Sequence, residues 1–202
     1  MAPRDNAKRL LDVALSAAGL GALAPLLVGV GVAVKLDSKG PALYGHERVG
    51  RGWTPFRVWK FRTMVTDADS IGPAVTAGGD PRITQIGRLL RATKLDELPQ
   101  LWNVLVGDMS MVGPRPEAAR YAEAFRADYD LILTVRPGIT DEAAILYRNE
   151  EALLSDADDP ERVYLEHILP KKIALYHRYL TDRSLGRDLS IILRTLEKVV
   201  LR

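Results

Sequence analysis

The stretch VALSAAGLGALAPLLVGVGVAV, residues 13–34, contains no charged side chain. As a helix rising about 1.5 Å per residue, it is long enough to cross a hydrocarbon core roughly 30 Å thick. Pro25 lies near its middle, removes the hydrogen bond to the Gly21 carbonyl and predicts a sharp bend there. Each arm then reaches through about half a bilayer. The segment therefore predicts a re-entrant helix that enters and leaves the membrane by the same face.

Basic residues flank this apolar stretch on both sides, and positive residues tend to stay cytoplasmic. A re-entrant helix would translocate neither flank, whereas a spanning helix would translocate one. A plain transmembrane anchor and a cleaved signal peptide are the two alternatives, but Pro25 directly after the cleavage-like sequence Ala22-Leu23-Ala24 disfavours the second. The flanking cations are Arg4, Lys8, Arg9, Lys35, Lys39, Arg48 and Arg51.

The 202 residues correspond to about one domain, and they include no cysteine. This excludes disulfides, thiol nucleophiles and cysteine-based metal sites. Up to Arg62 there are ten basic and four acidic residues (+6), and after it eighteen and twenty-two (−4). That asymmetry favours anionic lipid or a phosphorylated substrate and no nucleic acid. We expect a membrane segment, residues 1–36, joined in one functional unit to a catalytic domain, residues 37–202.

The remaining pattern predicts an α-rich α/β fold. Strand-forming residues occupy 42–49 and 56–63 on either side of Gly50-Arg51-Gly52, which predicts a small β-hairpin. Residues 64–82 are polar and without periodicity, as in a functional loop. Helical spacing follows at 83–90, 98–105 and 117–133.

A clear amphipathic helix is expected over residues 189–200, with an apolar stripe opposite a charged face. It either packs on the core or lies along the membrane surface as an interfacial amphipathic helix. Packing is the simpler expectation. The stripe consists of Leu189, Ile192, Leu193, Leu196, Val199 and Val200.

Candidate catalytic groups concentrate at Asp96 and Glu97. In the simplest interpretation Asp96 caps a helix whose first turn contains Glu97 and Pro99. The same geometry serves catalysis, because a helix N-terminus stabilises an ionised carboxylate and accepts a phosphate beside it. An aspartate there could attack phosphorus, provided that cations neutralise the repulsion between the two anions.

Four cations are candidates for that role. Arg91 precedes Asp96 by five residues, and Arg115 is held between two prolines, which suits fixed phosphate recognition. Lys60 and Arg62 alternate with aromatic residues, which places both on one face of a strand. An exposed turn and an ordinary solvated strand explain these positions equally well.

A set of short motifs then occurs in one order over most of the chain. They are KRLLD (8–12), the apolar stretch with its central proline, KGP (39–41), ERVG (47–50), KFRTM (60–64), LDELPQLWNV (95–104), GDMS (107–110), VGPRP (112–116) and RPGIT (136–140). In this set the chain resembles the bacterial sugar transferases, small monotopic phosphoglycosyl transferases that start glycan assembly on a polyprenyl phosphate carrier.

The resemblance implies a re-entrant helix broken at Pro25 and a catalytic pair at Asp96 and Glu97. In that family the aspartate attacks the β-phosphate of a UDP-sugar, expels UMP and holds a phosphosugar that polyprenyl (undecaprenyl) phosphate then accepts. Magnesium is the implied cofactor, with Asp96 as its ligand. Arg91 and Arg115 are the implied phosphate clamps, and Glu97 assists proton removal from the acceptor.

The resemblance further implies a monotopic enzyme at the cytoplasmic face of the bacterial inner membrane, in contact with lipid. Whether two copies form a homodimer stays open. The sugar also stays open, because the family's usual Gly-apolar-Ala-Gln after RPGIT is replaced here by Asp141-Glu142-Ala143-Ala144. Ala24 likewise stands where many members carry a hydroxyl residue before the proline.

Two alternatives from other classes are kept. A glycosyltransferase that moves the sugar alone would release UDP rather than UMP. A membrane-anchored scaffold would use Asp96 only as a helix cap and would show no turnover.

Overall fold

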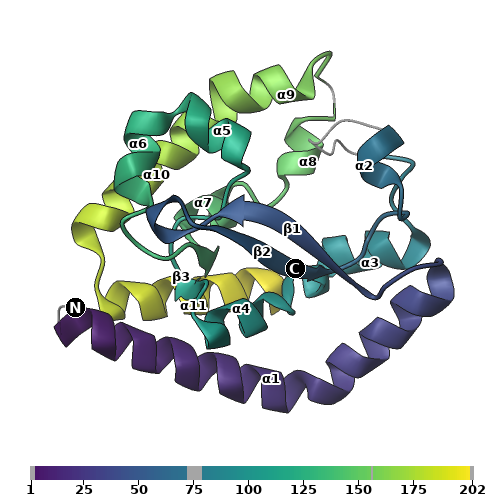
Figure 1. Ribbon diagram of the computed structural model, residues 1–202, viewed down its shortest axis with the longest axis horizontal. Coiled ribbons are helices and arrows are strands. Elements are labelled where there is room, and N and C mark those ends of the chain that lie inside the picture. The colour runs from purple at the N-terminus through teal and green to yellow at the C-terminus, as the bar shows by residue number, and fades with distance from the viewer. Residues whose placement is uncertain (1–2, 72–78, 156, 201–202) are drawn as a thin grey trace.

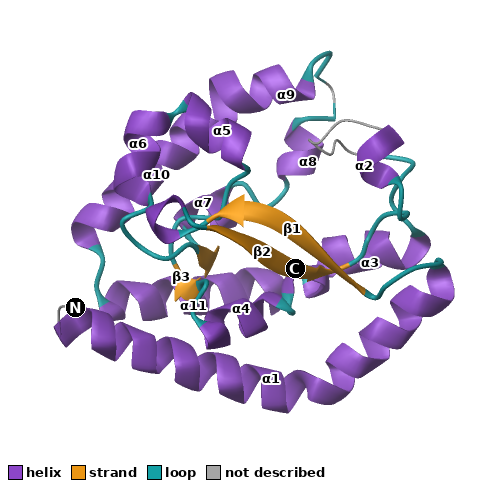
Figure 2. Cartoon of the chain, viewed as in Figure 1, coloured by secondary structure: helices purple, strands orange, loops and turns teal. Residues whose placement is uncertain are grey.

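The computed structural model describes residues 3–71, 79–155 and 157–200 (Figure 1). Helices predominate, with two small sheets between them (Figure 2). The helices are α1 (Pro3–Asp37), α2 (Ala68–Ile71), α3 (Gln85–Thr93), α4 (Gln100–Val106), α5 (Ala119–Ala124), α6 (Arg126–Ile132), α7 (Glu142–Leu146), α8 (Glu150–Leu153), α9 (Pro160–Val163), α10 (Leu169–Asp182) and α11 (Leu185–Val200). The strands are β1 (Leu43–Val49), β2 (Pro55–Phe61), β3 (Ser110–Val112) and β4 (Gly138–Thr140).

Helix α1 runs along one side of the molecule and changes direction partway along its length (Figure 1). It continues through Pro25 as one helix of 35 residues. By length and composition it is apolar and long enough to cross a membrane, and little of its apolar window is buried. The expectation of a long apolar N-terminal helix is therefore confirmed.

The face of α1 that meets the rest of the protein carries small and branched residues. A side chain at Gly19 would approach Leu101 of α4 to 3.1 Å, so glycine lets the two helices lie close. Further along, Val30 and Val34 are buried against Phe61 of β2. Both halves of α1 thus pack on the same body.

The predicted hairpin is confirmed. Strands β1 and β2 pair antiparallel, from Leu43 opposite Phe61 to Val49 opposite Pro55. A single turn of 3₁₀ helix, Arg51–Trp53, connects them, and Gly52 in this turn has a φ of 65° that glycine adopts readily. This pairing fixes which side chains of β2 face the functional site.

A second pair, β3 and β4, is parallel, with Ser110 opposite Gly138. Here the two chains approach so closely that a Cβ on Gly138 would lie 2.1 Å from the Gly113 nitrogen. Only glycine fits at this contact. The close approach holds the segment after β3, which carries Arg115, in a fixed place.

The main core lies among α5, α6 and α10 and is rich in tyrosine. The expectation of one helix over 117–133 is wrong, because the backbone leaves the helical region at Phe125 (φ −121°, ψ 43°). Two short helices result. Tyr121 and Tyr129, on either side of the break, are both buried in the same core.

Helix α11 covers the residues expected to be helical, but most of the expected apolar stripe is not packed on the core. Leu193 and Leu196 are 65% and 55% exposed, and Leu189 is also exposed. The buried residues of this helix are Asp188 and Ile191. The packing expectation is therefore wrong for most of the stripe.

The predicted loop over 64–82 contains a short helix, α2, and an isolated bridge between Met64 and Ile83. Residues 72–78 of that prediction lie outside the described residues. The bridge fixes the two ends of the loop beside each other.

Candidate functional site

A cavity of about 1000 Å³, called here the large cavity, lies between the β1–β2 hairpin and helices α3, α7 and α11. All six catalytic and substrate-binding residues expected from the sequence line this cavity. They are Lys60, Arg62, Arg91, Asp96, Glu97 and Arg115. The structure thus brings together residues from four separate segments of the chain.

The backbone around Asp96 is set by two helix boundaries. Helix α3 ends at Lys94, which adopts a left-handed conformation with φ 60°, and a 3₁₀ turn, Leu95–Glu97, follows directly. Helix α4 then begins at Gln100 without any side-chain cap. The expectation that Asp96 caps a helix is therefore wrong, because Asp96 lies inside the 3₁₀ turn.

Asp96 is only 7% exposed, and its Oδ1 atom has no hydrogen-bond partner among the described residues. Burial raises the pKa of this carboxyl, opposed by the positive charge of Lys60. An ionised Asp96 is therefore desolvated and poorly paired. A carboxylate in that state is a stronger nucleophile than one that accepts several hydrogen bonds.

Glu97 lies in the opposite situation. Its Oε1 accepts from Lys60 Nζ at 2.8 Å and from Arg115 Nη2, while Oε2 accepts from Arg115 Nη1 at 3.2 Å. Burial favours the neutral acid, but Arg115 and Lys60 outweigh it and hold the pKa of Glu97 well below its usual range. Glu97 is an ionised anchor for two cations.

The two cations respond to this pairing differently. Burial lowers the pKa of Lys60, and Glu97 opposes the change. The carboxylate of Glu97 raises the pKa of Arg115, which stays protonated. The side chain of Arg115 keeps some exposure, 32%, so part of the guanidinium faces the large cavity. A bidentate guanidinium held this way suits recognition of a phosphate.

Arg62 and Arg91 are held by neighbouring segments. The Arg62 guanidinium donates to the Ser38 carbonyl at 2.8 Å and to the Lys39 carbonyl, so it secures the end of α1. Arg91 donates from Nε to the Thr63 hydroxyl at 2.9 Å. Sequence reasoning assigned both to substrate, and the structure adds a structural role for Arg62.

Two further polar residues were not expected from the sequence. Arg148 lines the large cavity with a buried Nη2 that has no partner in the described part of the chain. Asp141 is 3% exposed, caps α7 through the Ala144 N–H at 2.8 Å, and has its other oxygen unpartnered within the same described part. Burial raises the pKa of Asp141 to about 6. Only their side-chain burial, which depends on long-range packing, identifies them.

The described residues contain no cluster of three or more histidine, cysteine, aspartate or glutamate side chains. A structural metal cage is therefore not formed from them. Magnesium commonly binds one or two carboxylates and completes its shell with water and substrate phosphates. Asp96 offers one carboxylate with a free oxygen, which fits this mode, whereas both oxygens of Glu97 are occupied by cations.

Comparison with known proteins gives relatives over nearly the whole chain. A UDP-glucose:undecaprenyl-phosphate glucose-1-phosphate transferase of Caulobacter vibrioides is 40% identical over 97% of this chain and 70% of its own length. An undecaprenyl-phosphate galactose phosphotransferase of Salmonella typhimurium is 37% identical over 96% of this chain but only 40% of its own length.

A UDP-N-acetylgalactosamine-undecaprenyl-phosphate N-acetylgalactosaminephosphotransferase of Aeromonas hydrophila is 33% identical over 96% of this chain and 43% of its own length. The chain thus spans less than half of two of these relatives. The three names share an acceptor and differ in the sugar. The family model for bacterial sugar transferases matches residues 3–202, and the chain belongs to this family.

Proposed function

We propose that this protein transfers a sugar 1-phosphate from a UDP-sugar to undecaprenyl phosphate and releases UMP, as the initiating step of glycan biosynthesis. The names of its relatives support the donor and acceptor classes. The observation that carries the mechanism is the contrast within one pair: Asp96 has a buried, unpartnered oxygen, while the adjacent Glu97 is held by two cations.

In the first step a carboxylate oxygen of Asp96 attacks the β-phosphorus of the donor. The bond from this phosphorus to the oxygen that bridges it to the α-phosphate breaks, and UMP leaves with the bonding electrons. A sugar phosphate remains as an acyl phosphate on Asp96. Arg115, Lys60 and Arg91 lie on the walls of the same cavity, where their charge offsets the repulsion between the carboxylate and the diphosphate.

In the second step a phosphate oxygen of undecaprenyl phosphate attacks the same phosphorus. The Asp96–phosphorus bond breaks, the carboxylate is restored, and an undecaprenyl diphosphate sugar leaves. An acceptor phosphate monoester, whose second pKa is about 6, is largely dianionic at pH 7 and has no proton to lose. Glu97, with its lowered pKa, is a weak base. We assign Glu97 the role of positioning Lys60 and Arg115.

Magnesium, when bound, would neutralise the diphosphate and stabilise the leaving UMP. Asp96 is the residue that would hold it, together with oxygens of the donor. The arginines of the large cavity contribute charge in the same place, so the demand on further protein ligands is small.

A re-entrant course for α1 is supported by how its two ends are held. Near the N-terminal end Arg9 donates to the Val104 and Leu105 carbonyls at 2.6 and 2.8 Å. At the other end Asp37 accepts from the Ile86 N–H at 3.1 Å. Both ends are fastened to one folded body, which a helix crossing the bilayer would place on opposite sides.

The exposed apolar residues near α1 support a membrane-facing surface, and the basic residues that flank the apolar run favour the cytoplasmic face of the inner membrane. Helices α4 and α11 lie beside α1 on one side of the molecule (Figure 1). Large apolar side chains are exposed on all three helices. They are Leu26, Val28, Trp102, Val106, Leu193 and Leu196. An amphipathic helix with such a stripe binds in the interface plane of a membrane.

The reaction is tested with purified protein in neutral detergent, magnesium, undecaprenyl phosphate and a panel of UDP-sugars that includes UDP-glucose, UDP-galactose and UDP-N-acetylgalactosamine. We expect acceptor-dependent UMP from at least one donor. UDP as the product would instead identify a transferase of the sugar alone. No turnover with any donor, by well-folded protein, would favour the scaffold.

The topology is tested by cysteine labelling in sealed inverted membrane vesicles, with single cysteines introduced at Asn6 and at Ser155. Both residues are exposed and lie outside the large cavity, and the parent chain has no cysteine. A re-entrant helix predicts that an impermeant reagent labels both positions. An N-terminus that is protected while position 155 reacts would show that α1 spans the membrane.

A further inference from the structure

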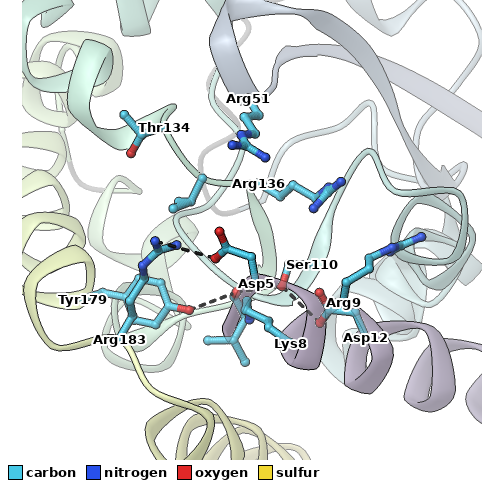
Figure 3. Close-up of a pocket in the computed structure, with 12 residues that line it drawn as sticks. Asp5, Lys8, Arg9, Asp12, Arg51, Ser110, Thr134, Arg136, Tyr179 and Arg183 are labelled. Carbon is cyan, nitrogen blue, oxygen red and sulfur yellow. Dashed lines mark hydrogen bonds and ion pairs between the residues drawn. The ribbon is translucent and has the colours of Figure 1, made fainter. Parts of the chain in front are cut away.

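A second, smaller cavity of about 70 Å³, called here the small cavity, lies at the N-terminal end of α1 (Figure 3). It shares no lining residue with the large cavity. Strand β3 separates the two, because Ser110 and Val112 line the small cavity whereas Met111 between them lines the large one. The small cavity is therefore a separate feature of the fold.

Its lining is strongly basic, with five cationic and two anionic side chains. The anions are already engaged. Asp12 accepts from the Ser110 hydroxyl at 3.1 Å and from the Met111 N–H at 2.9 Å, and Asp5 lies 3.8 Å from Arg183. The remaining positive charge on the lining is thus not neutralised by its own carboxylates.

Three guanidinium groups carry that charge, and they come from distant segments: Arg9 of α1, Arg51 of the hairpin turn and Arg136 of the loop before β4 (Figure 3). Among the described residues, Arg9 and Arg136 donate only to backbone carbonyls, Arg136 to Gly107 at 2.7 Å. Arg51 makes no side-chain hydrogen bond or ion pair within residues 3–71, 79–155 and 157–200.

The three cations are close enough to repel one another. Burial lowers the pKa of Arg136, and the positive charges of Arg9 and Arg51 lower it further. Backbone carbonyls offset part of the charge of Arg9 and Arg136, and a bound anion would offset the rest. The turn that carries Arg51 is also fixed, since the Gly52 N–H donates to the Leu133 carbonyl at 2.8 Å.

We propose that the small cavity binds the phosphate group of an anion, with Arg9, Arg51 and Arg136 as its ligands. The volume is several times the roughly 10–15 Å³ that a single water needs, so the cavity admits a group larger than one water, such as a phosphate. Guanidinium forks match phosphate oxygens in geometry and charge. A phospholipid headgroup and free inorganic phosphate present the same chemistry. The lipid source rests on the proposed membrane placement of α1, whereas the anion site does not.

The test compares Arg51→Gln with Arg57→Gln. Both residues are exposed arginines of the same hairpin, but Arg57 lines neither cavity. In neutral detergent, the Tm of each protein is followed against inorganic phosphate at constant ionic strength. Loss of one charge-assisted hydrogen bond is expected to weaken the phosphate dependence roughly tenfold in Arg51→Gln and not in Arg57→Gln. Any phosphate that binds in the large cavity affects both variants equally.

A second arm distinguishes the source of the phosphate. Native mass spectrometry from neutral detergent measures retention of added phosphatidylglycerol against phosphatidylcholine. Retention of phosphatidylglycerol that Arg51→Glu abolishes and the control Arg57→Glu preserves supports a lipid headgroup. A phosphate-dependent Tm without lipid retention supports free phosphate. Identical behaviour of the Arg51 and Arg57 variants in both arms would overturn the proposal. Transferase turnover is expected to be unchanged in Arg51→Gln, so failure here and failure of the proposed reaction are distinguishable.

Discussion

Charged groups are buried in two regions, at the contact between α1 and β3 and in the large cavity. The two regions differ in whether these groups have hydrogen-bond partners. At the contact, both the Ser110 hydroxyl and the Met111 N–H donate to Asp12. In the large cavity, Asp96 Oδ1 and Arg148 Nη2 are buried without partners in the part of the chain that the structure describes. At the contact the polar groups hold α1. In the large cavity Arg62 also holds the end of α1, but Asp96 and Arg148 each keep one atom unpaired among the described residues.

The difference separates structural from chemical carboxylates without reference to sequence motifs. A buried polar group without a partner costs free energy, and it persists where a ligand or a reaction uses it. Glu97 shows that proximity alone is not the criterion, because it is adjacent to Asp96 and yet fully engaged by Lys60 and Arg115. Hydrogen-bond satisfaction therefore assigns different roles to neighbouring acids.

The largest effect is expected at Asp96. Asp96→Asn removes the attacking anion, and we expect turnover to fall at least ~10³-fold, equivalent to about 4 kcal/mol. Because burial already disfavours the charge, the variant should be at least as stable as the parent. Steady-state UMP release and Tm in detergent measure the two effects, with the exposed Asp158→Asn as the control. Retained turnover would remove Asp96 from the chemistry.

A smaller loss of activity is expected for Glu97→Gln. The change keeps the shape of the side chain but removes the charge that holds Lys60 and Arg115. We expect kcat to fall ~10²-fold, about 2.7 kcal/mol, with an unchanged acid limb of the pH–rate profile. Loss of that limb would show that Glu97 is a general base instead. A rate equal to that of the parent would show that the cations need no anchor.

The contact between α1 and β3 should respond in stability rather than in chemistry. Asp12→Ala leaves the Met111 N–H without its acceptor and leaves the Ser110 hydroxyl only the Val112 carbonyl at 3.0 Å, which we expect to cost about 2 kcal/mol. Turnover per folded molecule should be close to that of the parent. Denaturant titration in neutral detergent gives the stability, and Asp12→Asn, which keeps one acceptor oxygen, is the matched control. A variant that is stable but inactive would contradict the division between the regions.

Asp141 should give the smallest effect, seen in the pH dependence of stability. Its folded pKa of about 6 lies above the ordinary aspartate pKa of 3.8, so the folded state binds more protons between these two pH values. Stability contributed by this group is therefore present at low pH and is lost as pH rises through about 6. We expect Asp141→Asn to remove about 1–2 kcal/mol of that dependence between pH 4 and 7. Parallel pH profiles of Tm for the two proteins would show that burial does not disfavour the ionised form of Asp141.

Much of the fold could be predicted from the sequence because it depends on local patterns. The apolar run of α1 and the strand formers around Gly50-Arg51-Gly52 identify the long apolar helix and the hairpin. The break at Phe125 and the exposure of Leu193 could not be predicted. Helical periodicity is the same for a continuous and a broken helix, and for a buried and an exposed apolar stripe.

The residues of the candidate site could be predicted from the sequence, but the contacts between them could not. Asp96, Glu97 and Arg115 were recognised through motifs, whereas the Lys60–Glu97 contact joins residues 37 apart in the chain. Such a contact depends on how β2 and the 3₁₀ turn pack, which no local pattern encodes. For the same reason the hydrogen bonds of Arg62 to the end of α1 were not foreseen.

The covalent role of Asp96 is tested most directly by intact mass spectrometry of the protein incubated with UDP-sugar and magnesium, without acceptor. We predict a mass increase of one sugar phosphate in the parent and in Glu97→Gln, absent in Asp96→Asn and discharged on addition of undecaprenyl phosphate. An unmodified parent that nevertheless turns over when acceptor is added, or an adduct that persists in Asp96→Asn, would contradict this mechanism.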